Sequence, residues 1–171
     1  RDTSVPNKIN NDRQINTLHK DFKPFAKAFV YKAWKSLGIK ITVNSGYRSV
    51  EYQRTMYNRW ISGTKEYQKK NAKPAKPGTS HHNVGTAIDF NPTLKNGKQL
   101  GKSFNNSKSE WKDSGLVQLG KDLGMRWGGD FSTNYDPIHF DIGNNRLSPS
   151  KRARILQEAE EKNIDVRKIS I

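Results

Sequence analysis

The side chains best suited to hold a metal ion lie in two short segments of the chain. His82 and Asp89 stand in the first segment, and if Gly85 turns the chain back between them, both side chains converge on one cation. His139 supplies a third donor in the second segment, where Asp136 adds a spare carboxylate. Zinc accepts imidazole nitrogen and carboxylate oxygen, and three protein ligands leave its fourth position for water. The pattern therefore predicts one zinc ion in a catalytic arrangement.

The histidine and cysteine content narrows the choice of ligands. The chain has no cysteine, which excludes thiolate metal sites, disulfides and a cysteine nucleophile. Of its four histidines, His81 is an alternative ligand to its neighbour His82, and we expect His19 to be exposed at a polar helix start. Asp141 lies two residues after His139 on the same face of a strand and is a candidate partner of that histidine.

Apolar periodicity indicates the elements that must carry these residues. Apolar residues recur at three- and four-residue steps from Leu18 to Leu37, which predicts an amphipathic helix, bent near Pro24 and ended by Gly38. Alternation over 39–43 predicts a short strand. The other predicted elements are helices over about 50–60 and 111–123, a long basic loop over 62–79, strands over 86–90 and 138–142, and a final helix capped by Ser148.

These elements predict the fold class. A length of 171 residues suits one domain with its own core. Helices packed on a small, mainly antiparallel sheet make an α+β fold with a single domain the expected architecture. Residues 1–12 are polar and rich in Asn and Lys, and we expect them to form a loose arm.

The chain is strongly basic, with 31 Lys+Arg against 16 Asp+Glu and a formal net charge of +15. Nucleic acid and an anionic cell envelope are both candidate partners for such a surface. The basic residues are spread from Lys8 to Lys168, which favours a solvated surface over a dedicated nucleic-acid site. No apolar run reaches the roughly 20 residues of a membrane helix, and no secretory signal peptide is visible.

Three segments together carry a family resemblance. Their matching positions are Ser45-Gly46-Tyr47-Arg48-Ser49 followed by Gln53; Ser80, His82, Gly85, Ala87 and Asp89; and Asp136 with His139, preceded by Trp127-Gly128-Gly129-Asp130. The three segments resemble the D-alanyl-D-alanine carboxypeptidase family of zinc peptidases, and within it phage endolysins of the L-alanyl-D-glutamate peptidase type. The resemblance covers roughly residues 15–142.

The resemblance implies a role for each metal-site residue. His82, Asp89 and His139 are the implied ligands of a single zinc ion, and the motif register selects His82 over His81. Asp136 is the implied general base, at a position where many members of the family have Glu.

The resemblance also implies residues that meet the substrate. Arg48 would stabilise the developing oxyanion or bind a substrate carboxylate. Ser80 and Gln53 are candidates for hydrogen bonds to the substrate.

The resemblance implies zinc-dependent hydrolysis of stem peptides in peptidoglycan, at the L-alanyl-D-glutamate bond. We expect a phage enzyme that acts at the bacterial cell wall, which it reaches through a membrane pore or as part of the virion. Alternatives are a D,D-carboxypeptidase or dipeptidase, a non-catalytic wall-binding module and a nucleic-acid-binding protein. We expect a monomer with no obligate nucleic acid. The expected divisions are a polar arm over 1–14, a zinc peptidase domain over 15–147, and a basic C-terminal helix and tail over 148–171.

Overall fold

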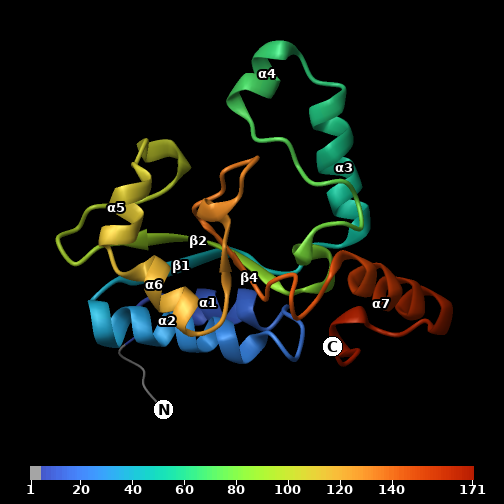
Figure 1. The fold of residues 1–171 in the computed structure, drawn as a ribbon, viewed down its shortest axis with the longest axis horizontal. Helices are drawn as coiled ribbons and strands as arrows, with labels where there is room; N and C mark the ends of the chain where they lie inside the picture. The colour runs from blue at the N-terminus through green and yellow to red at the C-terminus, as the bar shows by residue number, and fades with distance from the viewer. Residues whose placement is uncertain (1–4) are drawn as a thin grey trace.

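A four-stranded antiparallel sheet lies at the centre of the protein (Figure 1). The computed structural model describes residues 5–171. The strand order is β1-β2-β4-β3, so the chain's second and fourth strands are neighbours in the middle of the sheet. The predicted α+β class, single domain and antiparallel sheet are confirmed. The strands are β1 (Lys40–Ser45), β2 (Ala87–Thr93), β3 (Arg126–Trp127) and β4 (His139–Asp141).

Helix α2 (Lys23–Leu37) covers one face of this sheet. The Phe29 ring lies 5.1 Å from the rings of both Phe90 on β2 and Phe140 on β4, measured between centroids. The predicted bend at Pro24 is wrong. Pro24 lies in the first turn of α2, where backbone N–H groups have no acceptor within the helix. The missing N–H of proline therefore costs no hydrogen bond there. The helix ends at Gly38, as predicted.

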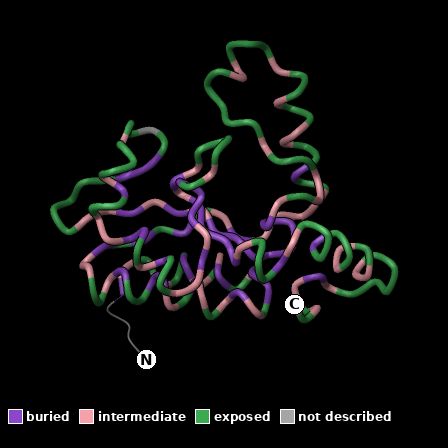
Figure 2. The backbone as a smooth tube through the Cα atoms, in the orientation of Figure 1, coloured by how far each residue is buried: buried purple, intermediate pink, exposed green. Residues whose placement is uncertain are grey.

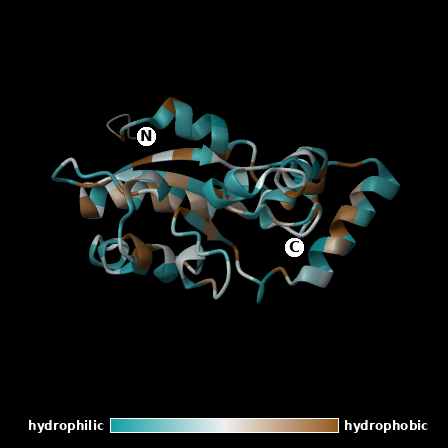
Figure 3. Cartoon of the chain, turned by 90° about the horizontal axis from the view of Figure 1, so that it is seen from above, coloured by the Kyte–Doolittle hydropathy of each residue, from teal (hydrophilic) through white to brown (hydrophobic). Residues whose placement is uncertain are grey.

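The expected loose arm at the start of the chain is wrong from Lys8 onward, and its first four residues lie outside the described ones. Helix α1 (Lys8–Ile15) packs against β1 instead. Asn11 is buried, donates to Ile41 O at 2.8 Å and accepts from Val43 N at 2.9 Å. Figure 3 shows that this helix, near the N label, is mostly hydrophilic. Side-chain hydrogen bonds to the backbone of the edge strand β1 hold the helix in place, and hydrophobic periodicity does not reveal such bonds.

Helices α3 (Val50–Ile61) and α4 (Lys65–Lys70) project away from the body of the protein (Figure 1). The helix predicted over 50–60 is confirmed, and Ser49 caps it by accepting from Tyr52 N at 3.0 Å. The predicted basic loop over 62–79 is wrong in part, because it contains α4. Thr64 caps that helix by accepting from Tyr67 N at 3.1 Å.

The rest of the chain forms shorter helices around the sheet. The single helix predicted over 111–123 is two helices, α5 (Lys108–Asp113) and α6 (Leu116–Asp122), separated at Gly115. Short 3-10 turns are η1 (His81–Val84), η2 (Lys102–Phe104), η3 (Gly128–Asp130) and η4 (Val166–Lys168). Helix α7 (Pro149–Lys162) is capped by Ser148, as predicted. Within residues 5–171, none of the helices combines the length and apolar character that a membrane span requires.

Candidate metal centre

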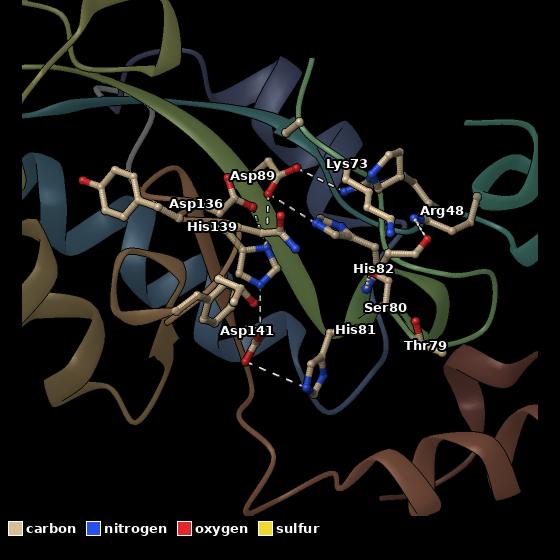
Figure 4. A pocket seen from close by; sticks show the side chains of 18 of the residues that line it. Arg48, Lys73, Thr79, Ser80, His81, His82, Asp89, Asp136, His139 and Asp141 are labelled. Carbon is tan, nitrogen blue, oxygen red and sulfur yellow. Dashed lines mark hydrogen bonds and ion pairs between the residues drawn. The ribbon is translucent and has the colours of Figure 1, made fainter. Parts of the chain in front are cut away.

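Three side chains converge at the floor of a cavity of about 570 Å³ (Figure 4). His82, Asp89 and His139 each offer one ligand atom, and these atoms all lie within 4.8 Å of one another. Asp89 Oδ1 lies 3.3 Å from His82 Nε2 and 3.3 Å from His139 Nδ1. The structure therefore brings together the three residues that the sequence predicts as ligands.

Strand register places two of these ligands side by side. Asp89 on β2 pairs with His139 on β4 in the antiparallel ladder. Side chains alternate between the two faces of a strand, so both point away from the face that carries Phe90 and Phe140. One face of the central strands therefore builds the core, and the other face carries the metal donors.

A capped 3-10 turn places the third ligand. Ser80 caps η1 by accepting from His82 N at 3.1 Å, and Asn83 Oδ1 accepts from Ser80 N at 3.3 Å. Gly85 ends the turn with a φ of 78°. A Cβ at this glycine would lie 2.6 Å from His19 N, so a larger residue would force the turn apart.

In each histidine ring one nitrogen is already hydrogen-bonded, which leaves the other nitrogen, His82 Nε2 or His139 Nδ1, for a metal. His82 Nδ1 donates to Gly46 O at 2.7 Å, and His139 Nε2 donates to Asp141 Oδ2 at 2.8 Å. Each ring is thereby oriented with its remaining nitrogen toward Asp89. Two imidazole nitrogens and one carboxylate oxygen form a donor set that fits zinc.

Burial and neighbouring charges shift the pKa of each of the three side chains. Burial opposes charge on His139, but its hydrogen bonds to Asp141 and Asp89 prevail and raise its pKa to about 10. Burial lowers the pKa of His82. The pKa of Asp89 lies well below its usual range; burial works against this, and the two adjacent histidines outweigh it. A metal bound here would replace the proton on His139 Nδ1, which faces Asp89.

Asp141 orients His139 and is itself held by Arg126. The Asp141 carboxylate is fully buried and accepts from Arg126 Nη2 at 2.6 Å, Arg126 Nε at 3.0 Å and Gly143 N at 2.8 Å. The suggested partnership of Asp141 with His139 is confirmed. Arg126 was missed by sequence reasoning, and only its cross-strand register with Asp141 could have pointed to it.

His81 lies beside the site but outside the ligand set. It is buried, its Nδ1 lies 2.8 Å from Thr86 Oγ1, and its Nε2 lies 2.8 Å from Arg152 Nη1. Burial, with a contribution from the Arg152 charge, lowers the pKa of His81 to about 4. Its Nε2 lies 3.9 Å from Oδ1 of Asp141, the carboxylate that orients His139. His81 therefore acts as a neutral hydrogen-bonding residue that links helix α7 to the site.

The expected exposure of His19 is wrong. Its side chain is fully buried, its Nε2 donates to Ile169 O at 2.6 Å, and its Nδ1 accepts from Asp21 N at 3.0 Å. The partner at Ile169 lies 150 positions away, so local polarity suggested the wrong environment.

Asp136 stands at the edge of the ligand set. Its Oδ2 lies 3.9 Å from His139 Nδ1, and its Oδ1 forms an ion pair at 3.0 Å with Lys102 from η2. Its backbone packs tightly on Gly128, where a Cβ would lie 2.2 Å from Asp136 O. The glycine therefore fixes the position of the carboxylate. Lys102 is a further cavity residue that sequence reasoning missed, because it lies in an irregular polar segment.

The three predicted substrate residues all line the cavity. Arg48 Nη2 lies 3.1 Å from Asp89 Oδ2, on the side of that carboxylate away from the histidines. Gln53 is buried; its Nε2 donates to Ala75 O at 2.9 Å, and its Oε1 has no partner among residues 5–171. Ser80 Oγ is engaged in capping η1. Substrate binding by these residues stays a prediction.

Comparisons with known proteins relate this chain to a family of peptidases. The family model described as D-alanyl-D-alanine carboxypeptidase matches residues 15–125. The peptidoglycan L-alanyl-D-glutamate endopeptidase CwlK of Bacillus subtilis is 34% identical over 110 residues, which cover 61% of this chain and 62% of CwlK. The alignment thus spans less than two thirds of that relative's length.

Two solved structures share the fold. The L-Ala D-Glu endopeptidase ChiX of Serratia marcescens has a TM-score of 0.53 at 17% identity, covering 81% of this chain and 90% of ChiX. The LdcB LD-carboxypeptidase has a TM-score of 0.53 at 22% identity, covering 88% of this chain and 66% of LdcB.

The family match ends at residue 125, before Asp136 and His139. Beyond that residue the structure supplies the third candidate ligand, since β4 brings His139 to His82 and Asp89, which lie inside the matched region. Because the matched region makes up more than half of the chain, this protein belongs to the D-alanyl-D-alanine carboxypeptidase family of peptidases.

Proposed function

We propose that this protein hydrolyses peptide bonds in the stem peptides of peptidoglycan, with one zinc ion held by His82, Asp89 and His139. The observation that carries the proposal is the convergence of these three donors in an open cavity, in a chain that belongs to a peptidase family. The donor set leaves room for a water molecule and a substrate carbonyl at the metal, as in other catalytic zinc sites.

The proposed chemistry divides between the metal and this chain's own side chains. When bound, zinc would polarise the scissile carbonyl and lower the pKa of its bound water to about 7. The Asp136 carboxylate would accept a proton from the attacking water and pass it to the leaving amine. Its position 3.9 Å from the ligand nitrogen of His139 suits this task, because water at the metal would be within its reach.

Arg48 has two roles in this proposal. Its contact with Asp89 Oδ2 holds the carboxylate in place, so that Oδ1 faces the two histidines. The Arg48 side chain is 21% exposed and lines the cavity, so its guanidinium would be available to a substrate oxygen. Gln53 also lines the cavity and is proposed to contact the substrate.

For the bond cleaved, we propose the one between L-alanine and D-glutamate. The support is the 34% identity to the Bacillus subtilis relative named for that bond. Hydrolysis of D-Ala-D-Ala is the alternative that the family description favours. We further propose that the protein is a monomeric phage enzyme acting at the cell wall, on the basis of its motif resemblance to phage endolysins.

The test is mass spectrometry of purified peptidoglycan digested by the wild-type protein, with and without a chelator. We expect new N-terminal D-glutamate, abolished by the chelator and restored by zinc. Release of free D-alanine would replace the endopeptidase assignment with the carboxypeptidase one. Metal-independent digestion would refute the zinc mechanism.

A matched pair of variants tests the base. Asp136→Ala should lose at least about 100-fold in kcat while retaining one equivalent of zinc, since general-base catalysis contributes roughly this factor. Asp113→Ala, which removes an exposed carboxylate at the end of α5, should keep full activity. Full activity of Asp136→Ala would remove that residue from the mechanism.

A further inference from the structure

The projecting segment over residues 54–79 contributes nothing to the core. From here on it is called the arm, and the name no longer refers to the N-terminal residues. It comprises most of α3, all of α4 and the chain that returns to the metal site. Figure 2 shows its tube in the exposed and intermediate colours, and none of its residues is buried. Packing therefore does not explain the amino-acid composition of the arm, and the charge on its surface needs another explanation.

That surface is strongly cationic. The arm carries seven basic residues and one acidic residue, Glu66, so that it holds a net +6 of the chain's +15. Every one of the basic side chains is exposed. They are Arg54, Arg59, Lys65, Lys69, Lys70, Lys73 and Lys76.

Most of these charges are not neutralised within the protein. Lys70 pairs with Glu66 at 3.2 Å, and Arg54 pairs with Glu51 at 3.1 Å. For the other five, no carboxylate of residues 5–171 lies within ion-pair distance. Like charges concentrated on a thin projection repel one another, so an anionic partner would relieve a cost that the fold itself leaves in place.

The arm also forms one wall of the cavity that holds the metal donors. Met56 from α3 and residues 72–75 from the returning chain line that cavity. Lys73 belongs to both surfaces: it lines the cavity, and its ammonium lies 5.6 Å from the centre of the Trp60 ring. A polymer lying along the arm would therefore end beside the metal site (Figures 1 and 4).

We propose that the arm binds a phosphate-bearing polymer of the cell wall and thereby holds the cavity against the peptidoglycan to which that polymer is attached. Five of the seven cations are lysines, whose compact ammonium groups suit single phosphates along a flexible chain. The choice of a wall polymer over nucleic acid rests on the proposed function, because the arm opens onto the proposed peptidase site.

The direct test uses soluble poly(glycerol phosphate), a probe that contains no peptide bond. Binding to the wild-type protein is measured by fluorescence anisotropy at rising salt. With five phosphate contacts, the affinity should fall about 100-fold between roughly 50 and 200 mM salt. The arm variant Arg59→Gln, Lys65→Gln, Lys69→Gln, Lys76→Gln should bind at least about tenfold more weakly and show a flatter salt dependence.

A charge-matched control separates the arm from general basicity. The quadruple variant Lys27→Gln, Lys32→Gln, Lys40→Gln, Lys112→Gln removes four exposed lysines elsewhere and should bind within about twofold of wild type. Equal losses in the two variants, or no binding by wild type, would overturn the proposal. Tenfold tighter binding to single-stranded DNA of equal charge would overturn it in favour of nucleic acid.

A second measurement keeps this proposal distinct from the peptidase proposal. Cleavage of a soluble muropeptide should be unchanged in the arm variant, whereas digestion of intact walls should slow. Walls stripped of phosphate polymers with cold hydrofluoric acid should be digested equally by both proteins. If muropeptides are not cleaved but the polymer still binds the arm, the peptidase proposal fails and this one stands.

Discussion

Replacement of Asp141 by asparagine tests how far the proposed zinc site depends on a residue outside its ligand set. The two side chains have nearly the same shape, so the change removes charge without opening a cavity. The asparagine oxygen can still accept the hydrogen bonds made to one of the two carboxylate oxygens. Its amide nitrogen, however, would face a donor, either His139 Nε2 or the Arg126 guanidinium, both of which now donate to the carboxylate.

The size of the effect follows from burial and the number of bonds. The Asp141 side chain has 0% exposure, so no water replaces the lost acceptor on the His139 side. Loss of such an orienting carboxylate typically weakens metal affinity 10–100-fold, or by about 1.4–2.7 kcal/mol. We expect the upper end, because the same carboxylate also carries the Arg126 charge. Arg126 is 35% exposed and can partly rehydrate, so the stability loss should be about 2–3 kcal/mol, below the full cost of breaking a buried pair.

Zinc affinity is measured by competition with a chromophoric chelator, and metal-free stability by urea unfolding. Asp130→Asn is the matched control, since Asp130 pairs with Lys121 and Lys108 on the surface. It should change either quantity by less than about 0.5 kcal/mol. Zinc affinity of Asp141→Asn within about twofold of wild type would refute the argument that this carboxylate orients His139.

Three further outcomes are expected from the structure. Zinc affinity should rise about tenfold per pH unit from about pH 6 to 8. The raised pKa of His139 means that its imidazole is protonated in this range and that zinc must displace one proton from it. Competition titrations that show pH-independent affinity would contradict this. Gln53→Met should lower the free energy of unfolding by about 1 kcal/mol, because it removes the hydrogen bond to Ala75 O. It should also raise KM and speed limited proteolysis of the chain over 72–79, and an unchanged rate of that proteolysis would exclude this anchoring role. Ser148→Ala should lower the free energy of unfolding by about 1 kcal/mol through the lost cap of α7, whereas Ser36→Ala, at an exposed position within α2, should not lower the urea midpoint.

The parts of the site that could be predicted from the sequence are those whose geometry is local. Seven positions separate His82 from Asp89, and the intervening turn and strand bring them together within one segment. Alternation along β4 likewise placed Asp141 beside His139. These inferences needed only the repeat of a strand and the chemistry of the donors.

The features that could not be predicted depend on partners distant in the chain. Asn11 is buried because it bonds to the backbone of β1, 30 and 32 positions away. His19 is buried by contact with Ile169, and Lys102 reaches Asp136 from an irregular segment. Polar residues that are satisfied through tertiary hydrogen bonds look like exposed ones in a single sequence, because periodicity records only apolar faces.

The position of the metal donors depends on the core behind them. Ile88 pairs with Phe140 in the ladder, one residue away from the pairing of Asp89 with His139. A slip of β4 by one residue would turn Phe140 toward the cavity and press His139 against Phe29 of α2. Exposing that ring would cost about 1.5–3 kcal/mol, and burying the imidazole without its hydrogen-bond partners would add to this cost. The edge-to-face packing of Phe29 on Phe90 and its tilted packing on Phe140 therefore exclude the slipped register, and the same packing that stabilises the fold fixes the separation of the proposed ligands.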